Sequence, residues 1–182
     1  MWLYDSILLQ KNIIYVVSYL DDAYSKLLFS NLIYLNFFSK NNFINFYLSG
    51  KKNEEKNQII RFKNLLTFYD LTQQSKKSIK TYTIGLSYDE IMLIGALGQT
   101  TQRYSILNSC FGLTRGTFSF TNIQTTDFIK IKSEIIRINF LKSKILNLQT
   151  YRNLEKTLTD IENDLLFNSF DAINYGIIDE II

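Results

Sequence analysis

The chain contains no histidine and no proline, and its 182 residues include a single cysteine, Cys110. Without histidine, its side chains can form neither a Cys/His zinc site nor a serine hydrolase that relies on an imidazole base. One cysteine also excludes an internal disulfide and a cysteine-based metal cluster. We therefore expect no metal and no cofactor, and we expect Cys110 to be a small buried apolar residue.

Strong charge of one sign is also missing. The chain has 20 Lys and Arg against 17 Asp and Glu, a formal net charge of +3, and the basic residues are scattered among the acidic ones. Because nucleic-acid binding needs a concentrated basic face, we expect no nucleic-acid partner. No apolar run reaches the roughly 18 residues that would cross a bilayer, so we expect no membrane partner either.

The composition that is present favours one folded domain over residues 1–182, since 46% of the residues are hydrophobic and the length suits a single core. Runs of β-branched and aromatic residues predict strands at 12–20, 43–48, 81–86, 104–107 and 111–113. Apolar residues on one face predict helices at 23–38 and 59–69, and the segment 91–97, apolar nearly all round, predicts a fully buried helix. Strands that alternate with helices indicate an α/β protein.

From Asp127 to Thr150, apolar residues recur every three or four positions and predict a helix of about 36 Å, which should project or pair. In contrast, Ser49–Asn57 carries no apolar side chain. This second segment is typical of a solvated loop.

The order of these segments from Asp5 to Ile182 resembles the proteolytic subunit of Clp proteases. The likeness is clearest from Thr126 onward, where the long helix precedes an acidic stretch and the closing run 171–182. This resemblance implies an α/β, ClpP/crotonase-like superhelix of ββα units. It also implies a protruding strand-helix handle at about residues 115–150.

In that family a serine, a histidine and an aspartate hydrolyse peptide bonds. Matching this sequence to the family puts the serine position at Asp89, or at Ile91 if a two-residue deletion is placed later. The histidine position becomes Thr114, and the aspartate is retained as Asp164. Threonine cannot take a proton at neutral pH, so the resemblance leaves no catalytic residue set. We accordingly predict that the chain is not an enzyme.

Two other features of the matched site leave alternatives open. The family's glycine-rich oxyanion turn falls on Lys51, Lys52 and Asn53, which form either a solvated loop or a basic substrate clamp. Asp89, its neighbour Glu90 and Asp164 could form a carboxylate pair for acid/base chemistry. The simpler interpretation is that the two acidic residues at the helix start are stabilised by the helix dipole.

The assembly element of the family looks intact. In Clp proteases the handle stacks two seven-membered rings, so the resemblance implies a homo-oligomer, a heptameric ring, with an active Clp proteolytic subunit and an AAA+ chaperone as further partners. At the positions that match the chaperone-docking pockets, five side chains are apolar or aromatic: Ile33, Tyr47, Tyr104, Ile106 and Ile182. Two are polar, Asn45 and Gln74. We expect Ile33 and Ile106 to be core residues instead.

The leading hypothesis is a catalytically inactive, ring-forming subunit of an ATP-dependent Clp protease of the ClpR type, with a structural or regulatory role in organellar protein degradation. Family and composition together suggest a plastid such as the apicoplast, with the transit peptide absent from this chain. One alternative is a crotonase-like acyl-CoA enzyme. Another is a weak residual serine peptidase that uses Ser87, a residue that we otherwise expect to be a turn or capping hydroxyl.

Overall fold

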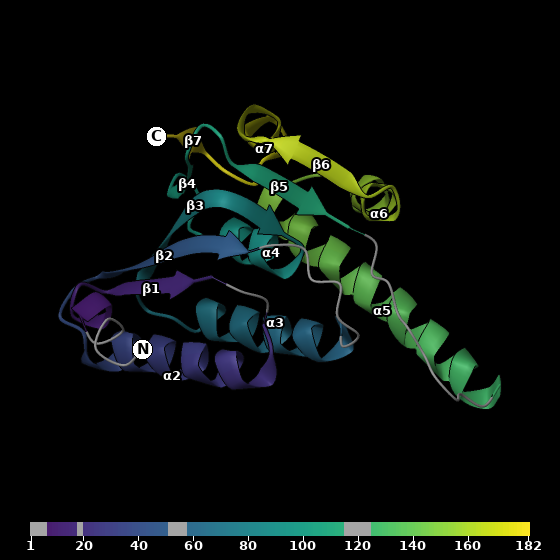
Figure 1. Ribbon diagram of the computed structural model, residues 1–182, viewed down its shortest axis with the longest axis horizontal. Coiled ribbons are helices and arrows are strands. Elements are labelled where there is room, and N and C mark those ends of the chain that lie inside the picture. The colour runs from purple at the N-terminus through teal and green to yellow at the C-terminus, as the bar shows by residue number, and fades with distance from the viewer. Residues whose placement is uncertain (1–6, 18–19, 51–57, 115–124) are drawn as a thin grey trace.

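A mostly parallel β-sheet forms the centre of the protein, and helices cover one of its faces, as the computed structural model shows (Figure 1). The structure describes residues 7–17, 20–50, 58–114 and 125–182. The strands are β1 (Ile13–Val16), β2 (Phe43–Gly50), β3 (Ser78–Tyr88), β4 (Arg103–Ser105), β5 (Cys110–Leu113), β6 (Leu165–Asn168) and β7 (Glu180–Ile181). The helices are α2 (Asp22–Phe38), α3 (Gln58–Gln73), α4 (Glu90–Ala96), α5 (Thr125–Thr150), α6 (Leu154–Glu162) and α7 (Ser169–Tyr175).

β3 is the strand around which the sheet is built. The main order is β1-β2-β3-β4-β7, and β3 also pairs with β5 further along its length. β6 runs antiparallel to β5, with Leu113 opposite Leu165. The predicted α/β class is confirmed, and the antiparallel β5–β6 pair makes the sheet mixed.

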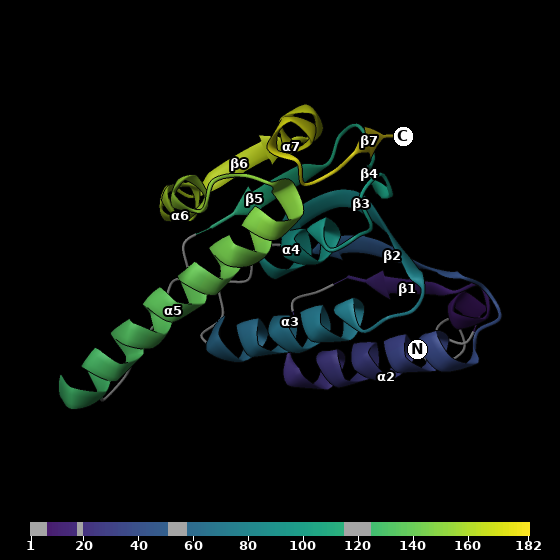
Figure 2. The same ribbon diagram turned by 180° about the vertical axis from the view of Figure 1, so that it is seen from behind.

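Alternation along the strands separates two faces of the sheet. Ile44, Phe46 and Leu48 of β2 are fully buried toward the helices, and the Phe46 ring meets Phe68 of α3 edge-on at 5.4 Å between centroids. This face is the core. Helices α2 and α3 lie side by side beneath the sheet in both views, and the short helix α4 contacts α3, β2 and β3 (Figures 1 and 2).

The opposite face carries a row of tyrosines, one from each of four neighbouring strands. Tyr15, Tyr47, Tyr82 and Tyr104 are in register across β1 to β4. The Tyr82 ring stacks on Tyr47 at 4.8 Å and on Tyr104 at 5.1 Å. Burial raises the pKa of Tyr82, and the neighbouring phenols of Tyr47 and Tyr104 raise it further. We call these four residues the tyrosine row.

Helix α5 extends well beyond the body of the protein (Figures 1 and 2). Its C-terminal half packs on the core through Ile138, Ile145 and Leu146, whereas Ile129 and Ile136 nearer its start are 68% and 60% exposed. The predicted long projecting helix is therefore present. Among the described residues, no helix is long and apolar enough to cross a membrane.

Several boundaries differ from the predictions. β1 ends at Val16 rather than at residue 20, and β3 is longer than the predicted 81–86. Ser49 and Gly50 belong to β2, and the remainder of the predicted loop, 51–57, lies outside the described residues, as does 115–124 at the predicted handle strand. The expectation for Cys110 is wrong. It begins β5 on the side away from the core and is exposed.

Arg103 joins four segments near the carboxyl end of the chain. It is 5% exposed, and its guanidinium donates to both carboxylate oxygens of Asp179 at 2.9 and 2.5 Å, to the carbonyl of Gly176 at 2.8 Å and to that of Gln149 at 3.2 Å. It therefore connects β4 to the ends of α5 and α7 and to the residue before β7. Burial alone would raise the pKa of Asp179, but the hydrogen bonds and charge of Arg103 outweigh it and hold the pKa below its usual value.

Because the folded-state pKa of Asp179 is lowered, this carboxylate stabilises the protein above its ordinary pKa of about 4, and the contribution disappears as the pH falls through the folded-state pKa. We predict that Asp179→Asn lowers the free energy of unfolding at about pH 7. Between about pH 7 and pH 3 the variant should also lose less of this free energy than the unchanged chain does. Urea unfolding at both pH values measures this.

Asp127→Asn is the matched control, since Asp127 is half exposed and its ion pair with exposed Lys130 is long, at 3.8 Å. It should leave the pH dependence unchanged. An equal loss of stability with acid in Asp179→Asn and in the unchanged chain would contradict this assignment.

Candidate active site

A sharp turn between β3 and α4 holds Asp89. Its φ of 44° and ψ of −108° are unusual for a residue other than glycine, and such a conformation costs about 1–3 kcal/mol. The surrounding structure holds it in place: the Asp89 N–H donates to the Gly112 carbonyl at 2.8 Å, and its carbonyl accepts from the Leu93 N–H at 2.9 Å. Asp89 therefore stands at the head of a buried helix.

The Asp89 carboxylate contacts Thr114, the residue that follows β5. One oxygen accepts from the Thr114 N–H at 2.8 Å and the other from the Thr114 hydroxyl at 2.7 Å. Both residues are buried, at 9% and 3% exposure. The interpretation that the α4 dipole accounts for Asp89 is incomplete, because its side chain makes no capping bond to the described helix and turns to Thr114 instead.

Asp164 lies at the same end of the β5–β6 pair. Since Leu113 is opposite Leu165, the antiparallel register places Thr114 and Asp164 next to each other beyond the last pair. Asp164 is exposed and has a φ of 51°. Topology thus gathers Asp89, Thr114 and Asp164, which are widely separated in sequence, at one edge. The other member of the predicted carboxylate set, Glu90, is buried in the first turn of α4.

Ser87 does not fit either of its predicted roles. It lies inside β3, opposite Gly50 of β2, and is 0% exposed, because β3 continues to Tyr88 before the chain turns. A fully buried hydroxyl cannot reach a substrate, nor does it cap α4. Its oxygen has no hydrogen-bond partner among the described residues. Ile91, the second candidate for the serine position, is a core residue of α4.

The positions matched to the oxyanion turn, Lys51 to Asn53, lie outside the described residues. The strand that leads to them packs tightly on α4: a Cβ added at Gly50 would come within 2.7 Å of Ile91 Cγ1. In the described part of the chain, no group of three or more His, Cys, Asp or Glu side chains could hold a metal ion.

The predicted docking residues fall into two groups. Tyr47 and Tyr104 belong to the tyrosine row and are half-buried, whereas Ile33, Ile106 and Ile182 are exposed. The expectation that Ile33 and Ile106 are core residues is therefore wrong. Asn45 and Gln74 are the two polar positions; Asn45 is half-buried in β2 and Gln74 follows α3.

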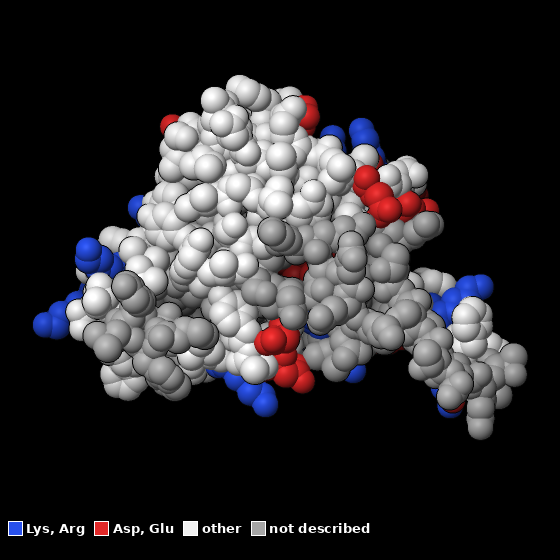
Figure 3. Space-filling model, in the orientation of Figure 1, with Lys and Arg blue, Asp and Glu red and all other residues white. Residues whose placement is uncertain are grey.

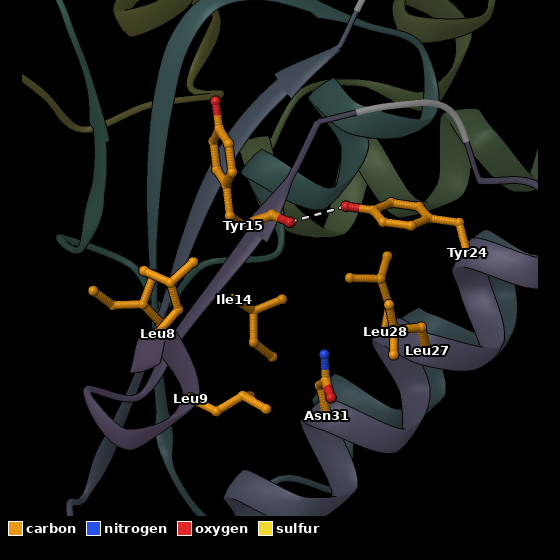
Figure 4. Close-up of a pocket in the computed structure, with 9 residues that line it drawn as sticks. Leu8, Leu9, Ile14, Tyr15, Tyr24, Leu27, Leu28 and Asn31 are labelled. Atoms are coloured by element: carbon orange, nitrogen blue, oxygen red, sulfur yellow. Dashed lines mark hydrogen bonds between the residues drawn. The ribbon is translucent and has the colours of Figure 1, made fainter. Parts of the chain in front are cut away.

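Two apolar hollows that the sequence did not suggest adjoin β1. One, of about 270 Å³, is lined by Leu8, Ile13, Ile84 and the rings of Tyr15 and Tyr47. The other separates β1 from α2, where the Tyr24 hydroxyl donates to the Tyr15 carbonyl at 2.9 Å (Figure 4). The only sequence signal for the second hollow was Asn31, a polar residue in an apolar helical run.

Charged side chains lie mostly at the margins of the face in Figure 3.

Comparison with known proteins decides the family. A family model described as Clp protease matches residues 3–182. The chain belongs to the Clp protease family. It is 27% identical to an ATP-dependent Clp protease proteolytic subunit of Bigelowiella natans, an alignment that covers 96% of this chain and 86% of the relative. It is 25% identical to ATP-dependent Clp protease proteolytic subunit 1 of Thermobifida fusca (strain YX), with 96% and 76% covered.

Solved structures agree with this assignment. A crystal structure described as a peptidase from Plasmodium falciparum superimposes with a TM-score of 0.85 and 25% identity, covering 97% of this chain and 98% of the other. These relatives are Clp subunits and a peptidase, so the comparisons favour a Clp subunit over the acyl-CoA alternative.

The same comparisons contradict the prediction that the chain is not an enzyme. Its relatives are named proteolytic subunits, and the family is one of peptidases. That prediction rested on the absence of histidine and on the residues at two matched positions, Asp89 and Thr114.

Removing the Ser87 hydroxyl tests the site description. We predict that Ser87→Ala stabilises the protein by up to about 1 kcal/mol or leaves it unchanged, because it removes a buried hydroxyl that lacks a described partner. Any peptide hydrolysis should also be unchanged. The measurements are urea unfolding and a fluorogenic peptide assay.

Ser109→Ala is the control, because the Ser109 hydroxyl accepts from the Gly85 N–H and donates to the Thr83 carbonyl. It should destabilise the protein by about 1 kcal/mol. If Ser87→Ala instead abolishes hydrolysis, Ser87 reaches the substrate and the present description of β3 is wrong.

Proposed function

We propose that the chain is a ring-forming subunit of an ATP-dependent Clp protease, and that its own contribution to proteolysis is structural or regulatory, in the manner of ClpR-type subunits. The observation that carries this proposal is helix α5 on a Clp fold. Its outer half projects from the body with Phe128, Ile129 and Ile136 at least half exposed. An isolated chain gains nothing from exposing large apolar side chains there, whereas a second subunit can bury them.

The anchoring of α5 supports the same role. The helix is tied to the body at its C-terminal end by Arg103, which binds the Gln149 carbonyl, and by the buried side chains Ile145 and Leu146. A rigidly held projecting helix can transmit contact between subunits without a large cost in ordering.

The exposed edge of the sheet supports a partner on the opposite side of the subunit. Ile106 and Ile182 are exposed, Tyr15 at one end of the tyrosine row is 43% exposed, and the apolar hollow at Tyr15 and Tyr47 adjoins the same sheet face. The relatives are named ATP-dependent subunits, so an AAA+ Clp chaperone is the partner that we propose for this face. Aromatic residues such as tyrosine are enriched in protein interfaces, and the isoleucines add apolar contact area.

An active Clp proteolytic subunit is the second partner in this proposal. This chain contains no histidine, and Asp89 and Thr114 bind each other. A mixed ring places such a subunit beside this one. A plastid such as the apicoplast is the proposed location, which the Asn-, Lys- and Ile-rich composition supports.

Mass measurement tests the proposal. Native mass spectrometry of the purified chain should give a complex of seven, or two times seven, copies of the 21.4 kDa subunit. Co-expression with a Clp proteolytic subunit that carries serine and histidine should give rings that contain both chains and hydrolyse a fluorogenic peptide. A monomer alone and no mixed complex would contradict the proposal.

A matched pair of variants tests the role of α5. Ile136→Asp replaces an exposed apolar side chain and should shift double rings to single rings by at least about tenfold, because burying an unpaired charge costs more than about 1.4 kcal/mol. Lys132→Glu, an exposed charged position on the same helix, should change the ratio little. If Ile136→Asp shifts the ratio of double to single rings no more than Lys132→Glu does, α5 makes no such contact.

A further inference from the structure

We propose that the Asp89 carboxylate is a latch that fixes the point at which the chain leaves β5 toward α5, and that this latch stabilises the ring. The second half of the proposal rests on the proposed function, and the first half does not. Thr114, the residue held by the latch, directly follows β5, and α5 (Thr125–Thr150) comes after it along the chain.

Asp89 makes three hydrogen bonds to the end of β5. Its N–H donates to the Gly112 carbonyl at 2.8 Å, and its two carboxylate oxygens accept from the N–H and the hydroxyl of Thr114 at 2.8 and 2.7 Å. Between these two residues, Leu113 is completely buried. The N–H and the carboxylate of Asp89 thus hold Gly112 and Thr114, the two residues that flank Leu113 in the core.

The Thr114 N–H depends on this contact. The β5–β6 ladder ends at Leu113 opposite Leu165, so the Thr114 N–H lies beyond it and is satisfied by the Asp89 carboxylate. Since Thr114 is 3% exposed, loss of Asp89 would leave a buried N–H and a buried hydroxyl without this acceptor. Such unsatisfied groups are costly, and the segment would open to reach water.

Steric contact makes the turn and the end of β5 a single packed unit. The ring of Tyr88, which precedes Asp89, lies against Gly112: a Cβ added there would lie 2.1 Å from Tyr88 Cδ1. The absence of a side chain at Gly112 lets the two strands approach. Because Asp89 itself has a φ of 44°, the turn keeps its shape only while its contacts with β5 hold it.

Amide hydrogen exchange tests the latch directly. Asp89→Ala should speed exchange of the Thr114 amide by at least about tenfold, because the carboxylate that accepts its proton is gone. Thr114→Val, which removes only the hydroxyl, should raise exchange less, and Thr114→Ser, which keeps the hydroxyl, should leave it unchanged. Exchange at Phe46 and Leu48 in β2 reports whether the fold as a whole is intact.

Ring stability is measured on the same proteins by dilution in native mass spectrometry. Asp89→Ala should raise the protein concentration at which the ring dissociates by at least about tenfold, and Thr114→Ser should leave that concentration unchanged. If Asp89→Ala exposes β2 as well, Thr114→Val serves as the milder variant for both measurements.

The latch would be overturned if the amide of residue 114 exchanged no faster in Asp89→Ala than in the unchanged chain or in Thr114→Ser. Faster exchange without a change in ring dissociation would overturn its role in the ring. If the unchanged chain forms no ring, the proposed function fails, and the exchange comparison still tests the latch in the monomer.

Discussion

The buried guanidinium of Arg103 is the constraint on which the arrangement of this subunit depends. It gathers the carboxylate of Asp179 and the carbonyls of Gly176 and Gln149 around one side chain. A buried ion pair is not a source of stability in itself, but losing one partner leaves the other charge unsatisfied, which typically costs about 3–5 kcal/mol. The value of Arg103 therefore lies in specifying one arrangement of β4, α5, α7 and β7.

A second cluster organises the neighbouring helices in a similar way. The Tyr175 hydroxyl donates to Asp160 at 2.9 Å, and the Arg152 guanidinium lies over the Tyr175 ring at 4.0 Å. Burial, followed by the bond to Asp160, raises the pKa of the Tyr175 phenol well above its ordinary value, so it remains a hydrogen-bond donor. Together, the two clusters fix α6 and α7 on either side of β6, the strand that begins just after Asp164.

Local patterns predicted most of the elements, because each depends on neighbours in sequence. The long helix α5 is an example. Contacts between distant residues were out of reach of periodicity: Arg103 and Asp179 are separated by 76 positions. Ser87 was misread because the sequence did not show that β3 continues to Tyr88. Only the family resemblance brought Asp89 and Thr114 to notice.

The central proposal is that this chain forms Clp rings that meet through a projecting helix held rigidly by its body. Single-particle electron cryomicroscopy of the purified protein tests it most directly, because one map reports both the ring and the surroundings of α5. We predict a seven-membered ring in which the outer half of α5, including Ile129 and Ile136, is covered by another subunit. Monomeric particles, or rings in which this half of α5 remains in solvent, would contradict the account.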